Sequence, residues 1–194
     1  MYNFVFLFIV FIILLSLFIY NESKNNELSY VESRIDNRKY LVRNVKDKQA
    51  AAELLSKMRI SIDKLIDHLE IYYPNDPRVK RLVKKFNPNR ISESLKGSKY
   101  TSYSVNKGQK IVLCLRSKDH QQKLTDLNTL MFVVLHELAH VLTVSIGHTK
   151  EFWSNFKFIL KEAVKIGVYK NIDYGKNPKP YCGIQVNDSP LHND

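Results

Sequence analysis

The stretch that decides the fold is residues 130–146, LMFVVLHELAHVLTVSI, in which apolar side chains occupy most positions. The exceptions are His136, Glu137, His140, Thr143 and Ser145. A helix that is apolar on all sides has to be buried. A charged glutamate and two histidines inside a core cost several kcal/mol without partners, and a metal ion with a bound water satisfies them. The stretch therefore predicts a buried helix that carries a metal site.

The spacing of His136 and His140 is that of an HExxH zinc motif. Residues four apart lie one turn apart on one helix face, so both imidazoles can bind one Zn²⁺ at about 2.0–2.1 Å. Glu137 adjoins the first histidine, where it can act as general base on a zinc-activated water. The pattern predicts one zinc ion per chain and peptide-bond hydrolysis. A chance HExxH on an exposed helix and a second membrane span are alternatives, which the apolar surroundings and the short, ionisable stretch disfavour.

Catalytic zinc usually has three protein ligands and one open position, so a third ligand is expected. His148 is the predicted third ligand, because Gly147 can adopt the positive φ that turns the chain back after the helix. A carboxylate from the next helix, Glu151 or Glu162, is the alternative. The remaining histidines have no spacing partner and are assigned no role: His68, His120 and His192.

The run HELAH, followed by His148-Thr-Lys-Glu-Phe152-Trp153, resembles the WLM and SprT-like zinc metallopeptidases, small zincins in which HExxH precedes H-x-x-x-[FW]. The longer runs VNKGQKIVLCLRS, GHTKEFW and DYGKNPKPYCGIQV resemble WLM-like proteins of large DNA viruses and algae over residues 100–186. The gap of seven residues between His140 and His148 is longer than is common in that family.

The resemblance implies an α+β fold, a minimal zincin-like (gluzincin-type) domain with a small antiparallel sheet packed on the HExxH helix. It implies that His136, His140 and His148 bind zinc, that Glu137 catalyses, and that the substrate is a protein or peptide. The family-like tail is expected to fold over the site. Tyr174 and Tyr181 in that tail are therefore candidate donors to the developing oxyanion, with plain packing as the alternative role.

Other segments follow from periodicity and turn residues. Helices are expected at 47–72, 78–86, 126–144 and 150–166, and strands at 39–43, 99–105, 110–116 and 184–186. The strand at 110–116, or its hairpin partner, is either the cleft rim that pairs with extended substrate or a plain core hairpin. One face of the last helix is expected to be buried and to hold His148 in place: Phe152, Trp153, Phe156 and Ile159.

Residues 2–20 are nineteen residues without a charge, which predicts a transmembrane helix. No basic residue precedes them and no small-residue cleavage site follows, which favours an uncleaved anchor. Basic residues on the C-terminal flank, the first being Lys24, predict a catalytic domain that faces the cytoplasm. The expected organisation is an anchor at 1–20, a polar tether at 21–38 and a zinc metallopeptidase domain at 39–194. The prediction is a single-pass membrane protein, of a host or virion membrane if the source is viral.

The chain has a formal net charge of +11, and residues 74–118 hold twelve basic and two acidic side chains. This basic block predicts contact with DNA or anionic lipid. It also supports an alternative function, a membrane-tethered nucleic-acid- or lipid-binding module with a structural zinc site. The two cysteines, Cys114 and Cys182, form no CxxC pair and no disulfide framework, and the sequence leaves open whether they are free.

Overall fold

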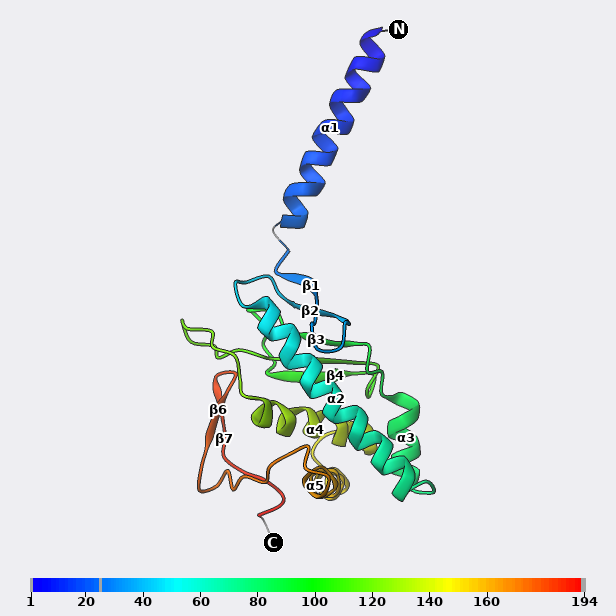
Figure 1. Ribbon diagram of the computed structural model, residues 1–194, viewed down its shortest axis with the longest axis vertical. Coiled ribbons are helices and arrows are strands. Elements are labelled where there is room, and N and C mark those ends of the chain that lie inside the picture. Colours follow the sequence, from blue (N-terminus) through cyan, green and yellow to red (C-terminus); the bar gives the residue numbers. More distant parts are fainter. Residues whose placement is uncertain (1, 25, 193–194) are drawn as a thin grey trace.

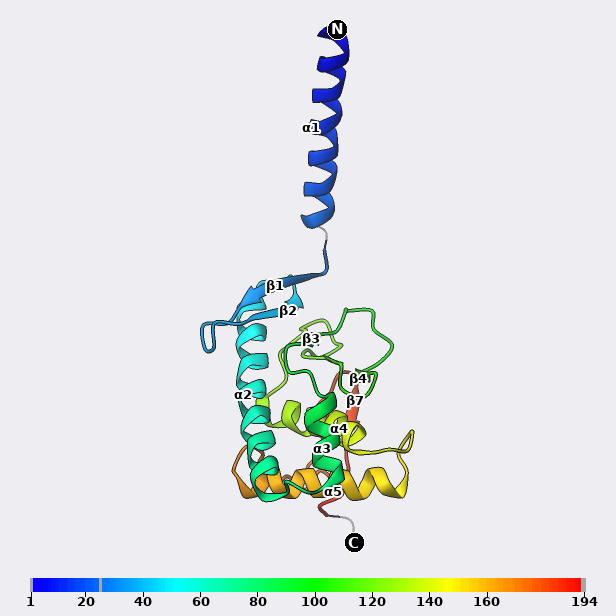
Figure 2. The same ribbon diagram turned by 90° about the vertical axis from the view of Figure 1, so that its right-hand side faces the viewer.

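The computed structural model describes residues 2–24 and 26–192, and within the first helix it describes the side chains of residues 4–20. That helix, α1 (Tyr2–Lys24), lies apart from the other elements in two perpendicular views (Figure 1, Figure 2). The other elements gather around one five-stranded sheet.

Helix α1 corrects the predicted membrane anchor. Among the residues whose side chains are described, no helix is long and apolar enough to cross a membrane. The predictions of a transmembrane helix, a single-pass membrane protein and a cytoplasm-facing domain are therefore wrong. The Lys24 side chain, on which the orientation rested in part, lies outside the described residues.

The main sheet has the strand order β1-β2-β3-β5-β4. Its strands are β1 (Leu28–Glu32), β2 (Lys39–Arg43), β3 (Ile91–Glu93), β4 (Ser102–Val105) and β5 (Lys110–Leu113). The pairs β1/β2 and β4/β5 are antiparallel, whereas β2/β3 and β3/β5 are parallel. The predicted antiparallel sheet is thus wrong, because two helices carry the chain from β2 back to start β3 in the same direction. Strand β1 also lies within the segment expected to be a tether.

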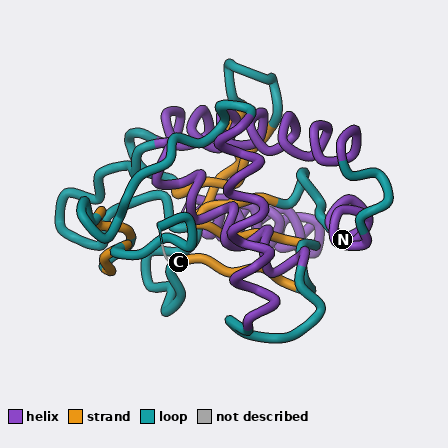
Figure 3. The backbone as a smooth tube through the Cα atoms, turned by 90° about the horizontal axis from the view of Figure 1, so that it is seen from below, coloured by secondary structure: helices purple, strands orange, loops and turns teal. Residues whose placement is uncertain are grey.

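Four further helices complete the fold, and all four were predicted. They are α2 (Lys48–Tyr72), α3 (Pro77–Lys85), α4 (Leu127–Leu142) and α5 (Lys150–Lys165). Helices α2 and α4 contact the sheet, whereas α3 and α5 pack against these two helices. Figure 3 shows helices crossing over the strands. Fully buried side chains from α2, β5 and α4, such as Leu55, Leu113 and Leu138, belong to one hydrophobic cluster. The apolar helix α4 is therefore in the core, as its sequence requires.

Local sequence sets where the two site helices begin. The Asp126 side chain accepts a hydrogen bond from the backbone N–H of Thr129 at the start of α4. Thr149 accepts one in the same way from Phe152 at the start of α5. Such N-caps satisfy backbone donors that the helix leaves unpaired. They fix the register of the residues that follow.

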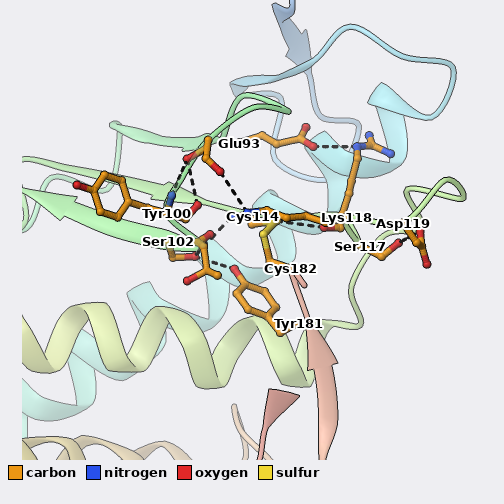
Figure 4. Close-up of a disulfide and its surroundings, with 12 residues drawn as sticks. Glu93, Tyr100, Ser102, Cys114, Ser117, Lys118, Asp119, Tyr181 and Cys182 are labelled. Carbon is orange, nitrogen blue, oxygen red and sulfur yellow. Dashed lines mark hydrogen bonds and ion pairs between the residues drawn. A yellow bond between two sulfur atoms is a disulfide. The ribbon is translucent and has the colours of Figure 1, made fainter. Parts of the chain in front are cut away.

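The tail forms a separate hairpin of β6 (Lys179–Tyr181) and β7 (Ile184–Val186). Its two central turn residues, Cys182 and Gly183, both have positive φ, as the tight hairpin turn requires. Cys182 forms a disulfide with Cys114, which lies one residue beyond β5 (Figure 4). The disulfide settles the state of the two cysteines that the sequence left open, and it joins the tail to the sheet.

Candidate metal centre and active site

Three histidines converge at the C-terminal half of α4. His136 and His140 lie on α4 and His148 lies in the loop that follows, and their candidate ligand nitrogens are all within 4.8 Å of one another. The Nε2 atoms of His136 and His148 are 3.1 Å apart. Two ligands of a tetrahedral zinc ion at about 2.05 Å keep a separation of about 3.3 Å. The donor set and its spacing therefore fit zinc.

The two alternative carboxylate ligands are occupied elsewhere. The oxygens of Glu151 accept hydrogen bonds from the backbone N–H groups of Val144 and Ser145, at 2.9 and 3.1 Å. Glu162 accepts hydrogen bonds from His68 and Tyr73. The structure thus brings His148, and neither glutamate, to the histidine pair.

The loop from Thr143 to His148 is held at several points. Gly147 has a φ of 83°, the left-handed conformation expected for the turn. The Nζ atom of Lys107 donates to the carbonyl oxygens of Thr143, Val144 and Ser145 at 2.9, 2.6 and 3.2 Å. These contacts hold the loop against the β4–β5 turn, and with it the position of His148.

Burial controls the charge of the site. Desolvation, followed by repulsion from the other histidines, lowers the pKa of His136 to about 3. Desolvation, with repulsion from His148 and Lys107, lowers the pKa of His140 to about 4. Both rings are therefore neutral at pH 7, which is the form that binds a metal. Burial also raises the pKa of Glu137 to about 7, against a backbone hydrogen bond from Ser104.

A cavity of about 570 Å³ opens beside these groups. Glu137 and all three histidines line it. Residues 101–104, which include the start of the edge strand β4, form one side. The cavity thus joins the metal-binding side chains, a buried carboxylate and the free edge of a sheet.

A model of the WLM domain matches residues 34–189, most of the chain. The chain belongs to the WLM domain family. This confirms the resemblance drawn from HELAH and GHTKEFW, and the family supports a function of the zinc metalloprotease type.

Viral proteins are among the relatives of this WLM domain. The chain is 38% identical over 180 residues to the uncharacterized protein R325 of Acanthamoeba polyphaga mimivirus, and the match covers 90% of each chain. It is 40% identical over 120 residues to the uncharacterized protein 042R of Invertebrate iridescent virus 3, covering 58% of this chain and 69% of the relative.

The fold resembles the crystal structure of Wss1 from Saccharomyces cerevisiae. The TM-score is 0.51 at 20% sequence identity, and the match covers 64% of this chain and 86% of Wss1. At that identity the likeness supports the fold of the WLM domain and carries no residue roles.

The aromatic face of α5 supports the histidines of the WLM domain. The Phe152 ring lies 4.9, 4.3 and 4.6 Å from the rings of His136, His140 and His148, measured between centroids. Phe152 is buried, as are Phe156 and Ile159, in agreement with the predicted scaffold face. Trp153 differs, since 42% of it is exposed. Its ring lies beside that of His148, with centroids 5.8 Å apart and the planes tilted by 39°.

The two tail tyrosines have different surroundings. Tyr181 lines the cavity, and its hydroxyl is 2.7 Å from Oγ of Ser102. Tyr174 is fully buried against Phe132, with ring centroids 4.8 Å apart, and is not among the cavity-lining residues. The structure brings Tyr181 to the site and leaves Tyr174 in the core.

Sequence reasoning missed the residues that hold the site. The sequence places Lys107 only in the basic block and Glu151 only among the alternative zinc ligands. A carboxylate in the first turn of α5 and a lysine at a hairpin tip are weak signals. Their partners are backbone atoms of a loop that the sequence does not place.

Several side chains of the basic block serve contacts inside the fold. Arg81 donates to the carbonyl oxygen of Leu142, and Arg78 pairs with Asp76. Arg116 is buried and pairs with Glu93 and Asp47. These contacts leave fewer of the block's charges for a partner, and binding of DNA or anionic lipid stays a prediction.

Proposed function

We propose that this WLM domain is a zinc metallopeptidase that hydrolyses peptide bonds in protein or peptide substrates. His136, His140 and His148 would hold one zinc ion, and Glu137 would act as general base. The observation that carries the proposal is the convergence of three imidazoles, spaced as zinc ligands, beside a buried carboxylate on an open cavity. A structural zinc site has no use for that carboxylate or for the open cavity.

Each side chain then has a distinct task. A bound zinc ion supplies Lewis-acid polarisation of the scissile carbonyl and lowers the pKa of the attacking water. Glu137 takes a proton from that water and passes it to the leaving amine. Ser104 orients the Glu137 carboxylate through its backbone hydrogen bond. The Phe152 ring contacts all three imidazoles and keeps them in place.

Strand β4 is the proposed docking edge for the substrate backbone. The sheet order puts β5 between β3 and β4, so β4 has one free edge, and residues 102–104 of β4 line the cavity. An extended peptide can add to such an edge through main-chain hydrogen bonds. Of the two alternatives that the sequence left open, the hairpin partner β4 rather than β5 suits this role.

Tyr181 is the proposed oxyanion donor of the two tail tyrosines, because it lines the cavity. Removal of one such donor lowers kcat by roughly 10². Tyr181→Phe is therefore expected to lower kcat with little change in KM. An unchanged kcat would assign the hydroxyl to its bond with Ser102 alone.

The test uses the full chain. The wild-type protein should contain about one zinc ion per chain and cleave an unfolded protein, whereas Glu137→Gln should keep the zinc and lose about 10³ in kcat. Zinc content by mass spectrometry and cleavage on gels provide the measurements. Full activity of Glu137→Gln would contradict the mechanism. Salt-dependent DNA binding without any cleavage by the wild type would favour a binding module instead.

A further inference from the structure

The β6–β7 hairpin lies against the active-site cavity. Tyr181, Ile184 and Val186 of the hairpin line the same cavity as Glu137. From α4, Phe132 and Val133 line it as well. The hairpin and the first half of α4 therefore enclose an apolar part of the cavity next to the metal site.

A disulfide and a hydrogen bond link the hairpin to the sheet, and its residues Tyr181 and Cys182 are buried in the main core cluster. Within the described part of the chain its two strands pair with each other as a separate sheet. The Cys114–Cys182 disulfide fixes its turn to the residue after β5. The hydroxyls of Tyr181 and Ser102 link β6 to β4 at 2.7 Å, as Figure 4 shows beside the disulfide. Both ties lead to the hairpin β4–β5 that borders the cavity.

The apolar side chain at the open end of this wall is Ile184. It is 51% exposed, whereas Tyr181 and Phe132 are buried. Exposed apolar surface beside a cavity gains free energy when an apolar ligand group covers it. An apolar ligand group can cover Ile184 and Val186 from the cavity side only if it extends from the metal site towards the hairpin.

We propose that the β6–β7 hairpin is a specificity wall of the cleft, which receives a large apolar side chain beside the scissile bond and is held in place by the Cys114–Cys182 disulfide. The proposal rests on the proposed peptidase function. Wall and disulfide act as one unit, because Cys182 is itself in the two-residue turn that joins Tyr181 of β6 to Ile184 of β7. Loss of the disulfide frees the hairpin turn and weakens the same preference.

The test compares two degenerate pools of peptides of about ten residues, one with Leu and one with Glu fixed at the central position. Cleavage by the wild-type full chain is measured as kcat/KM for each pool. Loss of an apolar contact is worth about tenfold or more in discrimination. Ile184→Lys should therefore lower the Leu-to-Glu ratio at least about tenfold.

Ile71→Lys is the matched control, because Ile71 is an exposed isoleucine on α2 that does not line the cavity. It should keep the wild-type ratio. The double variant Cys114→Ser/Cys182→Ser should lower the ratio as Ile184→Lys does, with zinc content still at about one per chain. An unchanged ratio in Ile184→Lys would overturn the wall, and an unchanged ratio in the double variant would overturn the role of the disulfide.

Binding separates this proposal from the peptidase function. The zinc-loaded Glu137→Gln form should bind the Leu pool more tightly than the Glu pool, and Ile184→Lys in that background should remove the difference. If the wild type cleaves but neither the cleavage ratio nor binding responds to Ile184→Lys, the wall is wrong and the peptidase function stands. If binding responds but the wild type cleaves nothing, the wall stands as a peptide-binding surface and the peptidase function fails.

Discussion

Two clusters of histidine and glutamate side chains differ in the partners that these side chains have. One cluster lies on α4, and the other joins α2 to α5. Glu162 on α5 accepts hydrogen bonds from His68 at 2.7 Å and Tyr73 at 2.8 Å, and Lys165 lies 3.7 Å away. On α4, the nitrogens of His136 face those of His148, and Glu137 opens on a cavity.

The difference teaches how to separate a structural cluster from a functional one. A carboxylate that already accepts hydrogen bonds from neighbouring side chains contributes to stability, and neither it nor those side chains are free to bind a metal. Neutral imidazoles whose nitrogens converge on one point can bind a single metal cation together. Residue type alone does not distinguish the two clusters, since both contain histidine and glutamate.

The largest expected effect separates the histidines of the two clusters. His148→Ala should weaken zinc binding at least about a hundredfold, because it removes a ligand, and removing even the partner of a ligand costs 10–100-fold. His68→Ala is the matched control and should leave the zinc affinity within about twofold. Competition with a chromophoric chelator measures both. Equal affinities in the two variants would remove the distinction between the clusters.

The second prediction concerns stability. Despite burial, hydrogen bonds from His68 and Tyr73 hold the pKa of Glu162 below its usual range. Glu162→Gln should lower the free energy of unfolding by about 1–3 kcal/mol at pH 7, with zinc content retained. Urea denaturation of the zinc-loaded forms measures the change, and lost zinc in this variant would contradict a purely structural role.

The lowered pKa of Glu162 also makes the stability of the fold depend on pH. A carboxylate with a lowered folded-state pKa stabilises the fold above its unfolded pKa, about 4.3 for glutamate, and loses that contribution as the pH falls through the folded pKa. The stability gap between wild type and Glu162→Gln should therefore be full at pH 6 and shrink below about pH 4. A gap that widens on acidification would reverse the assigned sign.

A smaller effect is expected from Lys107, which holds the loop of His148 without binding the metal. Lys107→Met removes three hydrogen bonds to that loop and should weaken zinc binding about tenfold. Lys107→Arg should restore part of the affinity, because it keeps a cationic donor. Lys110→Met, at an exposed position on β5, is the control. No change in Lys107→Met would show that Glu151 and Gly147 position the loop by themselves.

The sequence predicted the parts of this site that depend on local spacing. Helical periodicity predicted that His136 and His140 share one helix face, and Gly147 predicted the turn that brings His148 to them. Lys107, Glu93 and Glu162 depend on partners far along the chain, and no pattern reveals such contacts. The same holds for the parallel pairing of β3 and for the disulfide, since both depend on how distant segments meet. The antiparallel sheet was wrongly predicted because the sequence indicated the hairpin of β4 and β5 but no strand at β3.

X-ray absorption at the zinc edge tests the central claim most directly. The zinc-loaded full chain should show three imidazole ligands and one further light ligand at about 2.0–2.1 Å. His148→Ala should lose one imidazole, and Glu162→Gln should leave the spectrum unchanged. A wild-type site with two imidazoles, or a spectrum that does not respond to His148→Ala, would contradict the account.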